Sequence, residues 1–232
     1  GANVVPERMI MQLLAPTYGS PKISLQANDV TYAYNYDPNG TYKTKNFAEL
    51  QETTDKWSDT TNSDPMDDVS VALDAVEAET GERPSIMIDS RKPMANLKQN
   101  AKIKSAILAQ NVTANVFMTD NRVKEIFSSE LGISIIVYSK QYKKEDGTAA
   151  KFYPDGFATL IPSGALGNTW YGTTPEERTL MGSGEADVSI VNTGVAVAVT
   201  VTNDPVHTKT TASEIVLPSY ERMDSTYVIK CY

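Results

Sequence analysis

The chain has 232 residues, 41% of them hydrophobic, which suffices for one large domain or two modest ones around a buried core. Its formal net charge of −8 argues against a general nucleic-acid-binding protein, which would present a basic face. A lone cysteine, Cys231, excludes an intrachain disulfide and favours a reducing compartment, and the lack of an apolar run of about 18 residues excludes a membrane-spanning helix.

A helix and a hairpin are the first predicted elements. Residues Val4–Leu14 carry apolar side chains on one side of a helix, and Gly19–Pro21 ends it. Ile23–Leu25 and Val30–Tyr36 predict the two strands of the hairpin. Strand alternation places three tyrosines on one face of the second strand: Tyr32, Tyr34 and Tyr36. Because a lone hairpin is only marginally stable in water, this face needs a partner, either the rest of the chain or a neighbouring copy.

Residues 37–62 are polar and rich in turn formers, so we expect an irregular and partly mobile segment there. Acidic residues gather between positions 49 and 68: Glu49, Glu52, Asp55, Asp59, Asp64, Asp67 and Asp68. Such a cluster raises the question of a divalent-cation site, but its members lack the alternating spacing of a calcium loop. Helix capping is the simpler interpretation, and we predict no metal site.

The clearest predicted helix runs from Pro65 to about Thr80, capped by Asp64 and ended by Gly81. A strand at Ser85–Ile88 follows. Two more helices come next, one capped by Ser90 with Met94 and Leu97 facing inward, and one at Ala101–Ala109.

Residues 90–119 carry only basic charges: Arg91, Lys92, Lys98, Lys102 and Lys104. No aromatic residue is interleaved with these bases, so they lack the stacking platform of a nucleic-acid site. The basic segment either faces the acidic segment 49–68, within one chain or between copies, or forms a solvated surface.

Strands dominate the rest of the chain, after a helix that begins at Asp120 and ends at Gly132. Strands are predicted at Ile133–Tyr138, through Phe152 and Tyr153, and at Phe157–Ile161, with a short helix at 175–181. Further strands are expected at 195–202, 207–211, 214–217 and 226–231. Helices and strands interspersed without a regular βαβ repeat favour the α+β class.

Residues that could carry chemistry are few. His207 is the only histidine, and with Cys231 it cannot supply the three or four ligands of a zinc site. The sequence Gly182-Ser183-Gly184 lacks the strand and helix of a nucleophile elbow, and the loop 164–172 lacks the lysine of a phosphate-binding loop. We therefore predict no catalytic residue, no cofactor and no enzyme.

Several spaced motifs together resemble one family. They are Trp57-Ser58-Asp59, Asp64-Pro65, Gly81-Glu82-Arg83-Pro84, Val137-Tyr138, Phe152-Tyr153-Pro154-Asp155-Gly156, Leu160-Ile161-Pro162, Gly167 to Glu176, Asp204-Pro205-Val206 and Leu217-Pro218-Ser219. In this order, over nearly the whole chain, the sequence is similar to the major capsid protein E family of tailed bacteriophages and prophages, the lambda-like major head proteins. The family's pattern also implies an N-terminal arm that this sequence lacks, so a truncated N-terminus is expected.

The resemblance implies an HK97-type capsid fold. Residues 1–48 would hold a helix remnant and the extended hairpin. Residues 49–115 with 195–232 would form the peripheral domain with its spine helix, and 116–194 the axial domain. Expected contacts between copies are the three tyrosines of the hairpin with Trp170 and Tyr171.

The implied function is structural. Copies would form the hexamers and pentamers of an icosahedral shell around DNA, in the virion, after assembly in the host bacterial cytoplasm. Scaffold, decoration and portal proteins are the implied partners, without sequence-specific nucleic-acid binding or a membrane. Two alternatives stay open: another virion component (a tail or head-completion protein) or a non-viral binding module, and, more remotely, an enzyme with a β-rich cleft.

Overall fold

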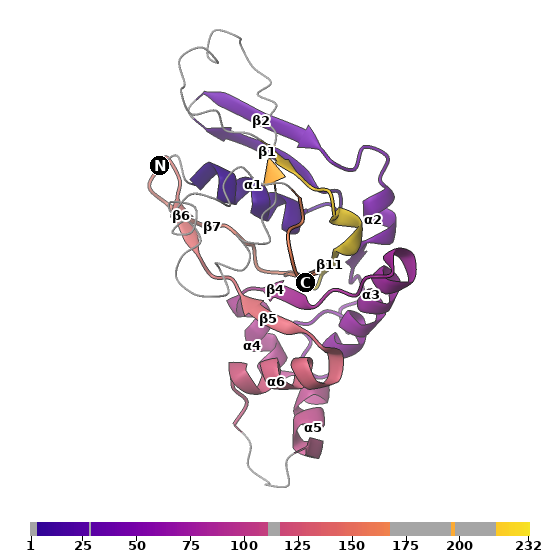
Figure 1. The fold of residues 1–232 in the computed structure, drawn as a ribbon. Coiled ribbons are helices and arrows are strands. Elements are labelled where there is room, and N and C mark those ends of the chain that lie inside the picture. The colour runs from indigo at the N-terminus through magenta and orange to yellow at the C-terminus, as the bar shows by residue number, and fades with distance from the viewer. Residues whose placement is uncertain (1–3, 28, 111–116, 168–195, 198–216) are drawn as a thin grey trace. The chain divides into compact units, whose positions relative to one another are not determined.

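The computed structural model describes residues 4–27, 29–110, 117–167, 196–197 and 217–232 (Figure 1). Helices and strands alternate irregularly along them, which confirms the α+β class. None of the helices in these ranges is long and apolar enough to cross a bilayer. The chain divides into two compact units, each built from separate segments. Unit 1 comprises residues 1–45, 140–152 and 163–224, and unit 2 comprises 46–139, 153–162 and 225–232.

Unit 1 is organised around the predicted helix and hairpin. Helix α1 (Val4–Leu14) has the predicted bounds and packs on strand β1 (Lys22–Ala27), which pairs antiparallel with β2 (Val30–Asn35). Gln12 ties the helix to the strand, because its side chain donates to the Ser24 carbonyl at 3.0 Å and accepts from the Ser24 amide at 2.9 Å. The prediction for this region is confirmed.

A second, smaller hairpin completes the described core of unit 1. Strands β6 (Gln141–Lys143) and β7 (Ala149–Lys151) pair antiparallel across the predicted turn at Glu145–Gly147. Lys140 Nζ lies 3.1 Å from the buried Glu7 carboxylate on α1. Strands β9 (Ala196–Val197) and β10 (Pro218–Ser219) form a further antiparallel pair.

Unit 2 contains a mixed five-stranded sheet in the order β3-β11-β8-β4-β5. Its strands are β3 (Phe47–Glu49), β4 (Ile86–Asp89), β5 (Ser134–Val137), β8 (Phe157–Ile161) and β11 (Tyr227–Lys230). The pairs β3–β11 and β4–β5 are parallel, whereas β8 runs antiparallel to both of its neighbours. The central strand β8 is buried along its whole length, as its apolar sequence predicts.

Four helices pack in unit 2 with the sheet: α3 (Pro65–Thr80), α4 (Arg91–Gln99), α5 (Ala101–Gln110) and α6 (Asp120–Leu131). Asp64 accepts a hydrogen bond from the Asp67 amide and Gly81 takes the left-handed conformation, so both predicted ends of α3 are confirmed. Helix α6 begins at Asp120 and ends before Gly132 as predicted, with Thr119 as its cap. One cap differs from prediction, because the Ser90 hydroxyl contacts Asp155 at 2.5 Å instead of capping α4.

One hydrophobic core unites these helices with the sheet. It includes Leu73 of α3, Leu97 of α4 and Phe127 of α6, each 0% exposed, against Met87 and Leu160 of the sheet. Burial of such side chains supplies the main stabilising free energy, at about 1.5–3 kcal/mol for each. Unit 2 therefore has its own core.

The predicted irregular segment 37–62 is more ordered than expected. It contains helix α2 (Thr41–Lys45) and strand β3, which the sequence analysis did not predict. Asp37 organises α2, since its carboxylate accepts from the amides of Tyr42 and Lys43 at 2.9 and 3.0 Å.

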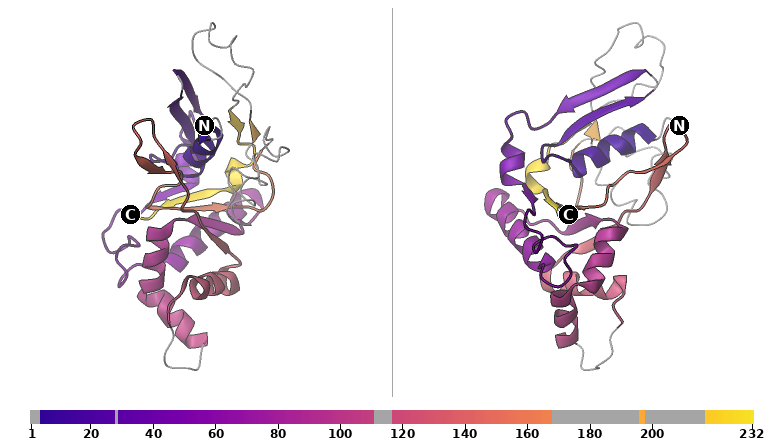
Figure 2. Two further views of the ribbon diagram at one scale, coloured as in Figure 1. Left: turned by 90° about the vertical axis from the view of Figure 1, so that its left-hand side faces the viewer. Right: turned by 180° about the vertical axis from the view of Figure 1, so that it is seen from behind.

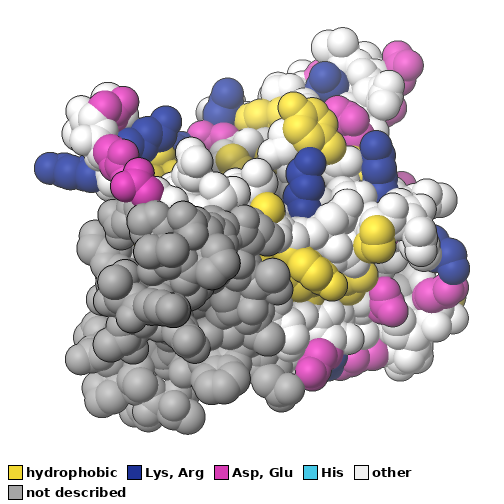
Figure 3. All heavy atoms as spheres, turned by 90° about the horizontal axis from the view of Figure 1, so that it is seen from above, with side chains coloured by type: hydrophobic (Ala, Val, Ile, Leu, Met, Phe, Trp, Pro, Cys, Tyr) yellow, Lys and Arg dark blue, Asp and Glu magenta, His cyan; other side chains and the backbone are white. Residues whose placement is uncertain are grey.

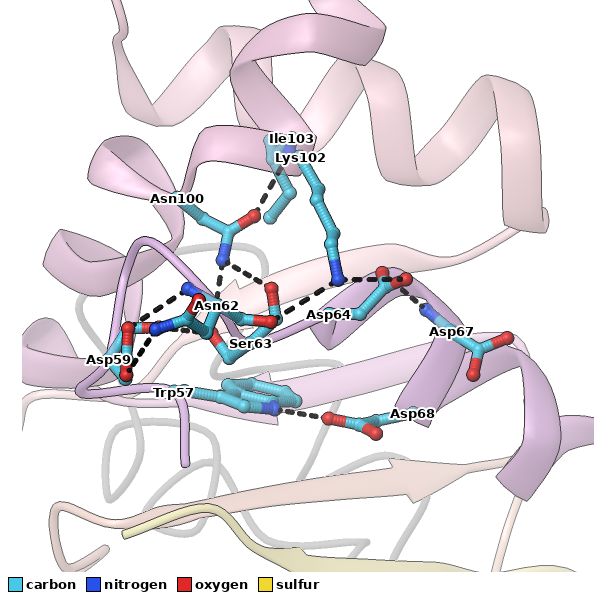
Figure 4. Close-up of polar contacts among 10 residues, drawn as sticks. All are labelled: Trp57, Asp59, Asn62, Ser63, Asp64, Asp67, Asp68, Asn100, Lys102 and Ile103. Carbon is cyan, nitrogen blue, oxygen red and sulfur yellow. Dashed lines mark hydrogen bonds and ion pairs between the residues drawn. The ribbon is translucent and has the colours of Figure 1, made fainter. Parts of the chain in front are cut away.

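A polar network fixes the loop that follows β3 (Figure 4). The fully buried Asn100, at the junction of α4 and α5, donates to the carbonyl and the hydroxyl of Ser63 and accepts from the Ile103 amide. Asp59 accepts from the amide and the side chain of Asn62. The fully buried Trp57 donates its indole N–H to Asp68 at 2.9 Å. These hydrogen bonds explain why the loop after β3 is ordered, although its polar composition indicated mobility.

The boundaries of the compact units differ from those of the predicted domains. Helices α3 and α6 share the core of unit 2, although the predicted boundary at 115/116 separates them. Residues 140–152, predicted as axial, belong to unit 1. The predicted helix at 175–181 and the strands at 207–211 and 214–216 lie outside the described residues, as does His207.

Candidate interaction surface

The tyrosines of the hairpin share one face, but their own chain covers them to different extents. Tyr32 is 5% exposed and lies opposite the buried Leu25, whereas Tyr34 is 52% exposed and lies opposite Ile23. Tyr36, just beyond β2, is half-buried. Tyr32 thus packs in unit 1 and has little surface left for a second copy. Tyr34 presents the most exposed ring of the three.

Tyr34 and Tyr36 form an aromatic cluster with a residue that the sequence analysis missed. The rings of Tyr34 and Tyr36 meet edge to face at 4.8 Å, and Tyr36 meets Tyr220 edge to face at 6.4 Å. The Tyr36 hydroxyl donates to the Pro218 carbonyl. Burial, and secondarily the neighbouring Tyr34, raises the pKa of Tyr36, so its hydroxyl stays a neutral donor. The motif Leu217–Ser219, directly before Tyr220, could have indicated this residue in the sequence.

A hollow of about 390 Å³ adjoins this cluster. Its lining comes from β2 and from the segment around β10: Tyr34, Tyr36, Leu217, Pro218, Ser219, Tyr220 and Glu221. Tyrosine rings, a proline and a leucine around one acidic side chain make a surface suited to an apolar or aromatic group. Figure 3 shows that, on the face where the hairpin lies, hydrophobic side chains are exposed in patches among charged ones.

The other predicted contact residues, Trp170 and Tyr171, lie outside the described residues. Within the described ranges, the exposed large hydrophobic side chains are few and separate: Tyr18, Tyr34, Val71, Leu108 and Phe117. Tyr34 alone of these belongs to an aromatic cluster that borders a hollow. The hairpin surface is therefore the best-formed candidate for recognition.

The acidic and basic segments of the sequence meet at one point. Lys102 Nζ of α5 lies 3.8 Å from the Asp64 carboxylate and donates to the Asn62 carbonyl at 3.2 Å (Figure 4). Two other bases, Arg91 and Lys98, pair instead with Asp120, at 2.9 and 3.0 Å. The predicted facing of the segments within one chain is confirmed for Lys102 alone among these three.

Two ionisable groups of unit 2, Asp89 and Cys231, are buried. Asp89 is fully buried, and neither of its carboxylate oxygens has a hydrogen-bond partner. Burial raises its pKa well above the usual value, so the group is held neutral. Cys231 is likewise buried, and burial raises the pKa of its thiol, so the reactive thiolate is disfavoured.

Asp68 has a more moderate shift. Burial raises its pKa to about 6, against the hydrogen bond from Trp57, and the neighbouring carboxylates of Asp64 and Asp67 add to the rise. A search of the described part of the chain finds no group of three His, Cys, Asp or Glu side chains that could hold a metal ion. The acidic segment is therefore described by its capping and hydrogen-bonding roles.

Comparison with known proteins decides the family. The sequence profile named phage major capsid protein E matches residues 5–227. The chain belongs to the phage major capsid protein E family. The resemblance predicted from the spaced motifs is confirmed, and the structural capsid role that the family name states agrees with the predicted function. A search of curated proteins finds no match.

Solved structures resemble this capsid-family chain in fold. One is described as the capsid protein of a prophage from Escherichia coli CFT073, with 16% sequence identity and a TM-score of 0.50, covering 99% of this chain and 63% of that one. Another is a phage-related protein from Bordetella bronchiseptica RB50, with 17% identity and a TM-score of 0.48, covering 80% of this chain and 56% of that one. The chain thus spans less than two thirds of the length of either.

Proposed function

We propose that the chain is the shell-forming subunit of a phage or prophage head, with an HK97-type fold, whose copies associate as hexamers and pentamers around DNA. Family membership over residues 5–227 supports the proposal, and so does the likeness in fold to the prophage protein. The acidic net charge of −8 suits a wall that encloses DNA without binding it tightly.

The observation that carries the proposal at the level of residues is the exposure of Tyr34. A tyrosine at 52% exposure, in edge-to-face contact with a second tyrosine and bordering an apolar hollow, is costly to leave in water and is typical of the buried centre of an interface. We infer that the hairpin surface, with Trp170 and Tyr171 as further contacts, lies against a neighbouring copy in the shell.

Replacement of Tyr34 by serine tests this assignment. Expressed from the complete reading frame, Tyr34→Ser is expected to reduce the yield of closed shells at least tenfold, because the loss of a central interface tyrosine costs about 2 kcal/mol or more. The thermal unfolding temperature of the subunit should hardly change, since Tyr34 contributes little to its own core. Negative-stain electron microscopy and sedimentation measure the yield of shells.

Tyr18→Ser is the matched control, because Tyr18 is an exposed tyrosine of the same unit, at 70%, that does not line the hollow. If Tyr34→Ser formed shells at the normal yield, the assignment of the hairpin surface to the interface would be wrong. Tail-like tubes or a single small ring from the unaltered protein would instead point to another virion component.

The remaining features of the proposal follow the family. The subunit belongs to the virion capsid, is assembled in the host cytoplasm, and meets scaffold, decoration and portal proteins there. The predicted organisation is part of the proposal: residues 1–48 as the helix and extended hairpin, 49–115 with 195–232 as the peripheral domain, and 116–194 as the axial domain.

A further inference from the structure

Helix α3 carries an outer surface that is acidic and partly apolar. Between Pro65 and Thr80 it has five acidic side chains and no basic one: Asp67, Asp68, Asp74, Glu77 and Glu79. Arg83 is shared by Asp74 and Glu77, at 2.8 and 3.1 Å, so one base serves two acids. The formal charge of α3 is therefore negative, and Asp67 and Asp74 are exposed on it.

At the centre of that outer surface lies Val71, which is 59% exposed. Ala75 and Ala78, four and seven residues further on, are exposed on the same face, and Asp67 and Asp74 border it. We call these five residues the α3 face. An exposed valine beside two alanines lets a second helix approach closely.

Helix α4 carries the reverse arrangement. It has three bases, Arg91, Lys92 and Lys98, and no acid. Arg91 and Lys98 share Asp120, at 2.9 and 3.0 Å, so here one acid serves two bases. Lys92 lies over the Tyr232 ring at 5.0 Å, and among the described residues it forms no ion pair with an acid.

The exposed surface of α4 centres on a small residue. Ala95 is exposed, and Arg91, Lys92 and Gln99 lie three or four positions away on the same side of the helix. With Lys98 these residues form what we call the α4 face. Its shape and charge complement those of the α3 face, with a small alanine to receive the valine and bases to meet the acids.

Helices α3 and α4 are separate elements of one compact unit. Both helices belong to unit 2, and α6 packs against each of them while α3 and α4 make little direct contact (Figures 1 and 2). A chain cannot bring its own α3 face onto its own α4 face without unfolding. Two complementary faces on one rigid unit are the requirement for a heterologous contact, which closes into a ring when the rotation between copies allows it.

We propose that the α3 face of one copy packs on the α4 face of the next copy, with Val71 against Ala95, in a head-to-tail contact. The inference rests on the proposed shell function and names a contact additional to the hairpin surface. Charge complementarity fixes the direction of the contact, because two α3 faces or two α4 faces repel each other.

Disulfide trapping tests the pairing. Chains with Val71→Cys are mixed with chains with Ala95→Cys, and the mixture is oxidised under assembly conditions and analysed on non-reducing gels. A covalent dimer is expected in the mixture and in neither variant alone, because a disulfide needs Cα atoms within about 7 Å. The native Cys231 is 0% exposed and adds little background. Ala95→Cys mixed with Ser128→Cys, an exposed site on α6, is the matched control and should stay unlinked.

Charge changes provide a second measurement on the same variants. Asp67→Lys in the Val71→Cys chain, or Lys92→Glu in the Ala95→Cys chain, should each lower the yield of cross-linked dimer at least threefold. The two changes together should restore part of it. Raising the salt from 0.05 to about 0.5 M should lower the yield of the unaltered pair, since exposed charges are screened.

The outcomes separate this contact from the shell function. Shells visible by microscopy without the Val71–Ala95 cross-link overturn the contact and leave the function standing. A cross-link within Val71→Cys alone overturns the head-to-tail direction. Absence of both the cross-link and any particle from the complete protein counts against the contact and the function together.

Discussion

At the scale of single residues, Asp89 stands out because its burial without hydrogen bonds lowers the stability of the fold. It ends strand β4 inside the core of unit 2, with neither carboxylate oxygen hydrogen-bonded. A raised folded pKa means that the folded state holds a proton which the unfolded chain releases above about pH 4. Unfolding is therefore favoured progressively as the pH rises from that value toward the folded pKa.

Substitution of Asp89 by asparagine should remove this pH dependence. As the pH rises above about 4 toward the folded pKa, the free energy of unfolding of the unaltered protein should fall relative to Asp89→Asn, by up to about 1.4 kcal/mol per pH unit, the contribution of one proton. Urea unfolding at several pH values, followed by tryptophan fluorescence, measures the difference.

Asp59→Asn serves as the control for that titration. Hydrogen bonds from Asn62 lower the pKa of the exposed Asp59, so its contribution should stay constant from pH 5 to 8 and be lost only in acid. A difference between the unaltered protein and Asp89→Asn that does not vary with pH would contradict the neutral state of Asp89.

At the scale of elements, the ends of α3 illustrate local control. Asp64 satisfies one of the free amides in the first turn, and Pro65 occupies the position that needs no donor. Asp64→Ala should lower the free energy of unfolding by about 1 kcal/mol, with the assembly of shells unchanged. Thermal unfolding measures the loss, and Asp64→Asn, which keeps the capping oxygen, should retain most of the stability.

Prediction from sequence succeeded where the signal is local. Helices α1 and α3 have the predicted bounds because apolar spacing, Asp64, Gly19 and Gly81 all act within a few residues. Strand β3 was missed because its three residues acquire their structure from β11, some 180 positions away. Helix α2 was missed because it depends on the capping by Asp37, which a polar, turn-rich composition concealed.

The candidate surface was also predicted only as far as its signal is local. The alternation of Tyr32, Tyr34 and Tyr36 could be predicted from the sequence. Their unequal exposure could not, since it depends on packing within unit 1, including Tyr220 from the distant segment around β10. Tyr32 was correctly placed on the tyrosine face and is nevertheless covered by its own chain. Burial depends on tertiary packing, which the periodicity of the sequence does not predict.

At the scale of the whole molecule, unit 2 depends on strands that are remote in sequence. The Val228 amide donates to the Asn46 carbonyl at 2.9 Å, and β11 joins β3 to β8 within the sheet. Val228→Pro removes that donor and should unfold unit 2, with a change in the tryptophan fluorescence of the protein. Val228→Thr keeps the donor and should remain folded, at a cost of about 1–3 kcal/mol for the buried hydroxyl. A native spectrum from the proline variant would show that β11 is dispensable.

The position of β11 in the sequence also determines when unit 2 can fold during synthesis of the chain. A nascent chain that has emerged from the ribosome as far as residue 220 carries α3, α4 and α6 but lacks the strand between β3 and β8. Its sheet stays split until residues 227–230 follow, so unit 2 is completed only after some 180 residues beyond β3 have been made. An unfinished chain that lacks residues 227–230 therefore offers no completed unit 2 for another copy to bind.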